Sequence, residues 1–231
     1  MIFYEATSFG LRVVTFQFVN KDNENIKTRL LPMVHIGSEK YYKEVEKYLD
    51  DCDRILFEEN GFKSWKIKIR NNDKTARKLN LVTQKELNLK QYEDRLIHAD
   101  FNQESGKEAW KNLTIIDKIK YNIVFPIWTY FQDKNITRLK FVKYFMKSVE
   151  DLDLIYGPYM DEKERIKGFV DDSREKRVFE ELDKIHIEKF DEEIQIAIVY
   201  GAGHMKAISN YMMNKLNYKS KEADFIEVFK I

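Results

Sequence analysis

Two of the four histidines in this chain, His35 and His204, are far apart in the sequence but lie in the same local setting. Each follows an apolar run, lies close to glycine, and comes directly before a segment with helical periodicity. In open sheets, ligands bind beyond the carboxyl ends of the strands, where side chains from separate strands converge. Two imidazoles placed there would suit metal binding or proton transfer.

An acidic side chain, Glu58, ends a third apolar run and would enter the same crevice if the three strands are parallel neighbours. His35, Glu58 and His204 are therefore predicted to bind a divalent metal, with Mn²⁺, Co²⁺ and Zn²⁺ preferred, and to leave positions open for water. Such a metal lowers the pKa of its bound water and polarises a carbonyl, as hydrolysis requires. Without a metal, the same three side chains would form an acid–base set.

Arg174 and Asp100 are predicted to position substrate in this pocket. The guanidinium of Arg174 would clamp a carboxylate or an oxyanion, although its strongly charged segment also fits a solvated helix face. Asp100 closes a helical pattern and would enter the pocket or serve as a helix-end residue. The single cysteine, Cys52, is interpreted as a small buried hydrophobe at a helix-to-strand junction.

Motifs for other chemistries are missing from the sequence. Gly201-Ala202-Gly203-His204 lacks the third glycine of a dinucleotide site and the Gly-Lys-Ser/Thr ending of a phosphate loop. It also fits a tight strand-to-helix turn. No HExxH pair, Gly-x-Ser-x-Gly elbow or paired cysteines are present. We therefore expect no nucleotide or organic cofactor.

The hydrophobic pattern predicts an α/β (α+β) fold: a mixed central sheet flanked by helices. Strands are expected over residues 2–6, 11–20, 27–34 and 54–59, and a helix capped by Ser38 over 39–49. After a long interval the pattern returns to strand over 194–200, helix over 205–216 and strand over 225–231. This organisation predicts two strand-turn-helix units that place His35 and His204.

The interval between these units, residues 61–189, is predicted to be a large, mostly helical insertion or cap. Helical spacing of apolar residues recurs over 79–100, 107–120, 137–154 and 174–187. No repeat or linker divides the chain. We therefore expect a single domain over 1–231, with residues 1–60 and 190–231 as its core.

The composition favours a globular cytoplasmic protein that binds neither nucleic acid nor membranes. The net charge is +1, and basic residues are spread among acidic ones rather than gathered in a stripe. The start of the chain does not resemble a signal peptide, and the longest apolar stretch is too short for a membrane helix. One cysteine suits a reducing compartment. The oligomeric state stays open, with a homodimer as one option.

The order of these motifs resembles the TraB/Tiki family, also called the pheromone-shutdown family, within the erythromycin-esterase-like and ChaN-like fold group. That family has two Gly-x-x-His motifs, a glutamate that ends the strand after the first motif's helix, and a later arginine. Gly201 to His204 matches the second motif in full, while Pro32-Met33-Val34-His35 has proline in place of glycine. Asp53 to Glu58 and Ser173 to Lys176 are similar to the glutamate strand and the arginine segment.

The resemblance implies a mixed sheet with the motif histidines and the glutamate at the site. It also implies a metal-dependent peptidase or a protein that captures a peptide pheromone. Together with the residues themselves, it favours a divalent-metal-dependent hydrolase of peptide or amide bonds. The alternatives are a non-catalytic peptide-binding protein and a metal-independent, esterase-like hydrolase. The expected partner is a peptide or a small amide or ester substrate.

Overall fold

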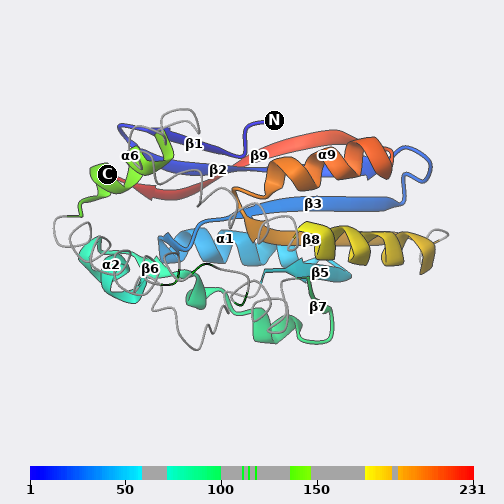
Figure 1. Ribbon diagram of the computed structural model, residues 1–231, viewed down its shortest axis with the longest axis horizontal. Coiled ribbons are helices and arrows are strands. Elements are labelled where there is room, and N and C mark those ends of the chain that lie inside the picture. Colours follow the sequence, from blue (N-terminus) through cyan, green and yellow to red (C-terminus); the bar gives the residue numbers. More distant parts are fainter. Residues whose placement is uncertain are drawn as a thin grey trace.

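The computed structural model describes residues 1–58, 72–99, 111, 114, 118, 136–146, 175–188 and 192–231. Within them, seven strands form one mixed sheet with helices on both faces, which confirms the predicted α/β class (Figure 1). The order along the sheet is β1-β2-β3-β8-β5-β7, and β9 pairs with β2. Most of the predicted helical insertion lies outside the described residues.

One half of the sheet is antiparallel. It contains β1 (Tyr4–Thr7), β2 (Gly10–Asn20), β3 (Ile26–Met33) and β9 (Tyr218–Lys230). β2 pairs with β9 along its whole length and with β1 and β3 along its opposite side. The last strand is longer than the predicted 225–231, because polar residues at its start continue the pairing with β2.

The other half is parallel and positions the candidate site. It joins β3 to β8 (Ile194–Gly201), β8 to β5 (Arg54–Phe57), and β5 to β7 (Leu96–His98). Met33 lies opposite Gly201, and Phe57 lies between Val199 and His98. The carboxyl ends of these strands therefore meet at one edge of the sheet, as the sequence predicts.

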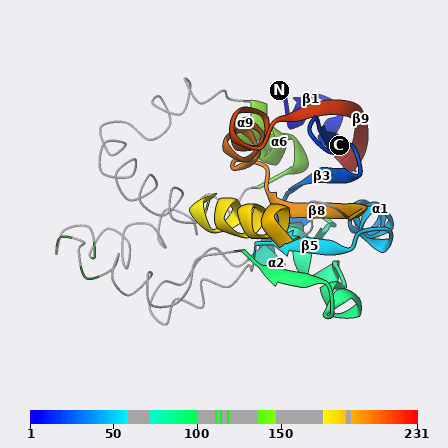
Figure 2. The ribbon, with the colours of Figure 1, turned by 90° about the vertical axis from the view of Figure 1, so that its right-hand side faces the viewer.

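Alternation along β8 divides the core between the two faces of the sheet. Ile196, Ile198 and Tyr200 pack with α9 (Met205–Lys215) and with the helix over 175–188. Ala197 and Val199 pack with α1 (Glu39–Asp50), α2 (Asn72–Lys78) and α6 (Arg138–Met146). Figure 2 shows α1 on one side of the strands and α9 with the helix over 175–188 on the other.

The predicted start of α1 is confirmed. The Ser38 hydroxyl accepts a hydrogen bond from the Tyr41 backbone N–H at 3.1 Å, as a helix cap should. The buried residues Tyr41, Tyr42, Val45 and Leu49 form the face toward the sheet. The helix therefore begins directly after the β3 turn and fixes the chain that carries His35.

The predicted helix over 79–100 is wrong. α2 ends at Lys78, and Asn80 adopts a positive φ of 52°. The chain then forms β6 (Val82–Thr83), two 3₁₀ turns (Gln84–Glu86 and Leu89–Tyr92), and β7; β6 pairs with β4 (Ile36–Gly37). Leu96 and Ile97 pair with β5, so long-range strand pairing overrides the helical spacing of the apolar residues.

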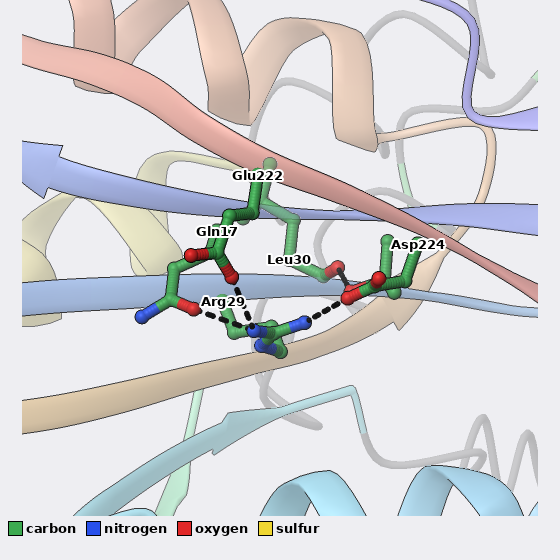
Figure 3. Close-up of polar contacts among 6 residues, drawn as sticks. Gln17, Arg29, Leu30, Glu222 and Asp224 are labelled. Carbon is green, nitrogen blue, oxygen red and sulfur yellow. Dashed lines mark hydrogen bonds and ion pairs between the residues drawn. The ribbon is translucent and has the colours of Figure 1, made fainter.

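A partly buried ion-pair network lies in the antiparallel half of the sheet (Figure 3). Arg29 donates to Asp224 Oδ2 at 2.9 Å and to Gln17 Oε1 at 2.5 Å, and its guanidinium covers the Tyr48 ring at 4.6 Å. A hollow of about 100 Å³ opens beside it. The three cationic side chains that line this hollow are each paired with a carboxylate: Lys27 with Glu193, Arg29 with Asp224, and Lys47 with Glu44. Through its bonds to Gln17 and Asp224, Arg29 ties β2, β3 and β9 together.

We expect Arg29→Met to lower the free energy of unfolding by about 1–3 kcal/mol, because the Arg29 side chain is only 15% exposed and its replacement removes its bonds to Asp224 and Gln17. Chemical denaturation of both proteins measures the difference. Lys43→Met is the control, since it breaks an exposed pair with Glu39 and should change stability much less. Equal stability of wild type and Arg29→Met would contradict this role.

Cys52 is buried, with 4% exposure, and its thiol lies 3.1 Å from the Tyr48 carbonyl oxygen. Burial raises the pKa of this thiol to about 12. Since only the thiolate reacts, we expect iodoacetamide at pH 8 to leave Cys52 unmodified in the folded protein and to alkylate it in urea. Mass spectrometry measures both states, and rapid alkylation of the folded protein would contradict the burial.

Candidate functional site

The candidate site begins where β3, β8 and β5 end together. Ala202, directly after β8, donates its backbone N–H to the Met33 carbonyl at 3.1 Å. This bond ties the Gly201-to-His204 turn to the last residue of β3. The ends of neighbouring parallel strands are the usual place for ligands in open sheets.

Glu58 lies directly after β5 and is buried, with 7% exposure. Its backbone N–H continues the pairing with β8 by donating to the Val199 carbonyl at 3.0 Å. Its carboxylate Oε2 accepts the Gly201 N–H at 2.7 Å. A buried carboxylate needs such donors, so Glu58 is held against the end of β8.

His204 occupies the N-cap position of α9, and its backbone N–H donates to the Gly201 carbonyl at 2.9 Å. Its ring nitrogen Nδ1 lies 3.1 Å from Glu175 Oε1, and the two side chains are only 13% and 17% exposed. Because a carboxylate only accepts, Nδ1 carries the proton in this contact. In the neutral ring, Nε2 is then the basic nitrogen.

The carboxylate of Glu58 and the ring of His204 converge on Gly201. A Cβ at this glycine would lie 3.0 Å from Glu58 Oε2 and 3.5 Å from His204 Cδ2. A side chain at position 201 would press on the carboxylate, which explains glycine there without any special backbone angle. The predicted meeting of Glu58 and His204 is thus present in the described residues.

His35 makes different contacts. It is exposed, its Nδ1 lies 2.9 Å from Gln84 Oε1, and its carbonyl accepts the Gln84 backbone N–H at 3.1 Å. Leu31 and Met33 point to the α1 face of the sheet, whereas Leu56, two residues before Glu58, points to the α9 face. The described contacts therefore attach His35 to Gln84 and do not join it to Glu58 and His204.

The turn before His35 is held by two buried phenols. Tyr41 donates to the Pro32 carbonyl at 2.8 Å, and Tyr42 donates to the Val34 carbonyl at 2.9 Å. Burial raises the pKa of both tyrosines, so both stay protonated donors. These contacts fix the chain where proline stands in place of a motif glycine.

Two predicted site residues, Asp100 and Arg174, lie outside the described residues. Glu175 was not predicted as a site residue. It directly follows Arg174 in the sequence, and nothing in the local sequence distinguishes Glu175 from neighbouring acids. Only its position at the start of the helical residues 175–188 brings it to His204.

Among the residues that the structure describes, no group of three or more His, Cys, Asp and Glu side chains is arranged to hold a metal ion. His204 and Glu58 are suitable donors, but a third described ligand does not accompany them. Bound metal therefore stays a prediction. The described helices include none that is both long and apolar enough to span a membrane.

In comparisons with known proteins, no protein-family model, curated protein or solved structure matches the chain. The resemblance to the TraB/Tiki family therefore rests on the motifs alone.

Proposed function

We propose that this protein is a hydrolase of peptide, amide or ester bonds, and that His204 is its general base. The observation that carries the proposal is the contact of His204 with Glu175 at 3.1 Å, beside the buried carboxylate of Glu58. A base held by a second group is the usual arrangement for activating water or another nucleophile. The carboxyl edge of the parallel strands is a suitable place for it.

In this mechanism, His204 Nε2 removes a proton from water as the water attacks the substrate carbonyl. The imidazolium that forms donates to Glu175 through Nδ1, and the negative charge of Glu175 stabilises it. His204 then returns the proton from Nε2 to the leaving amine or alcohol. The carboxylate of Glu175 keeps the ring in the tautomer that this cycle requires.

The backbone N–H groups that follow His204 would stabilise the negative charge of the tetrahedral intermediate. α9 starts at Met205, and the His204 side chain does not cap it. The first N–H groups of a helix have no partner within the helix and favour negative charge. They lie next to the proposed base, where the oxyanion would form.

The role of Glu58 is to hold the Gly201-to-His204 turn in place. Its bond to the Gly201 N–H fixes the residue from which the turn to His204 starts. Arg174 and Asp100 remain predicted substrate-positioning residues.

A histidine that binds metal through Nε2 also donates Nδ1–H to a carboxylate, so the Glu175 contact is compatible with a metal ligand at His204. The described residues contain no group of three or more His, Cys, Asp and Glu side chains that could hold a metal ion, and the mechanism above proceeds through His204 and Glu175.

The test uses the purified protein and a panel of p-nitrophenyl esters, amino-acid anilides and a mixed peptide library. Each substrate is assayed with EDTA and, separately, with added Mn²⁺, Co²⁺ or Zn²⁺; His204→Asn is the comparison. The proposal expects hydrolysis that EDTA leaves intact and that His204→Asn abolishes. Activity only with added metal would replace the mechanism by the metal-dependent one. Peptide capture without product, equal in both proteins, would overturn the proposal in favour of a binding protein.

A further inference from the structure

Tyr200 is a fully buried tyrosine that precedes the Gly201-to-His204 turn. Alternation along β8 directs its ring to the α9 face, where it packs with Ile198 and Met205. Glu58 follows Leu56 of the same face by two residues. The ring of Tyr200 is therefore on the side of the sheet that carries Glu58 and His204.

The phenol of Tyr200 spans from β8 to the end of β7. Its O–H donates to the Ala99 carbonyl at 2.9 Å. Because β5 lies between β8 and β7, this bond crosses β5 near its carboxyl end, where Glu58 follows. Ala99 in turn donates its N–H to the Phe57 carbonyl at 3.3 Å. The Tyr200 phenol thus ties β8 to the end of β7, and the backbone of Ala99 ties that end to β5.

The same ring also contacts His204. The ring centroids lie 5.4 Å apart, and the planes meet at 88° in an edge-to-face arrangement. Such pairs have a preferred geometry, so the position of the Tyr200 ring restricts the His204 ring. Phenylalanine would fill a purely apolar place equally well, whereas a buried phenol needs a partner for its O–H.

We propose that Tyr200 is a positioning residue, which holds the His204 imidazole in its working orientation by anchoring its own ring to Ala99. The expected loss of activity rests on the proposed function. The expected effect of the Tyr200 hydroxyl on the His204 ring is inferred from the contacts of Tyr200 with Ala99 and His204 alone.

The test compares Tyr200→Phe with wild type. Phenylalanine keeps the ring and removes only the O–H. The matched control is Tyr92→Phe, since Tyr92 is also buried and its hydroxyl contacts Asp50 and Glu46 on α1 instead. Long-range ¹H–¹⁵N NMR spectra report the two His204 ring nitrogens, kinetics report kcat and KM, and denaturation reports stability.

We expect Tyr200→Phe to shift the His204 nitrogen resonances and to lower kcat about tenfold with KM changed less than about twofold. Tyr92→Phe should lose comparable stability and leave the His204 resonances and kcat unchanged. Unchanged His204 resonances in Tyr200→Phe, or equal shifts in both variants, would overturn the positioning role. Shifted resonances in a protein without hydrolytic activity would refute the proposed function and keep the positioning role.

Discussion

His204→Asn is expected to lower kcat about 10²- to 10⁴-fold, which is the range that a general acid–base catalyst contributes. Asparagine keeps a side-chain N–H that can donate to Glu175, but it has no basic nitrogen at the position of Nε2. The change therefore removes proton transfer with little other disturbance. Steady-state kinetics on the best substrate of the panel measures the loss.

His35→Asn is the matched control for this prediction. His35 is exposed and contacts Gln84, so the acid–base mechanism expects kcat to change less than about threefold. Equal, large losses in both variants would show that the two histidines act together, as the metal-ligand hypothesis for His35, Glu58 and His204 requires. Activity retained by His204→Asn would remove His204 from the mechanism.

The second large effect is expected at Glu175. Glu175→Gln can still accept the Nδ1–H of His204, but it no longer carries the charge that stabilises the imidazolium. Loss of such a partner costs roughly 10²-fold or more in kcat, while KM should change little. Glu175→Ala should be at least as slow, since it also leaves the ring tautomer unfixed.

Glu180→Gln is the control on the same helix. Its carboxylate is 44% exposed and makes an i,i+4 pair with Lys176 at 3.9 Å. Removing this pair should change stability by less than about 0.5 kcal/mol and leave kcat unchanged. A comparable loss of activity from both glutamate variants would show that the helix responds to any change of charge, and that Glu175 has no special role.

Much of the parallel half of the sheet follows from local pattern. The strands that end at Met33, Phe57 and Gly201 each contain an unbroken apolar stretch before or at that end, as strands buried on both faces should. The strand Leu96–His98 was not predicted, because three residues are too few to show a periodicity of their own. Its pairing with β5 depends on contacts between segments far apart in the sequence.

The site is partly predictable for the same reason. Glu58 follows β5, and the turn to His204 follows β8. Because β5 and β8 are paired neighbours, the two residues come together at the ends of these strands. The position of His35 depends on two features. The last residues of β3 point to the α1 face of the sheet, and the His35 ring contacts Gln84, which lies in a segment that the sequence predicts to be helical. Glu175 reaches His204 from a separate helix, and sequence spacing carries no information on that contact.

The most direct measurement of the central claim is the tautomer of the His204 ring, read from a long-range ¹H–¹⁵N NMR spectrum of wild type and Glu175→Gln near neutral pH. The account predicts that the wild-type ring, in its neutral form, carries the proton on Nδ1, and that Glu175→Gln alters the nitrogen resonances. A wild-type ring protonated at Nε2, or a spectrum that Glu175→Gln leaves unchanged, would contradict it.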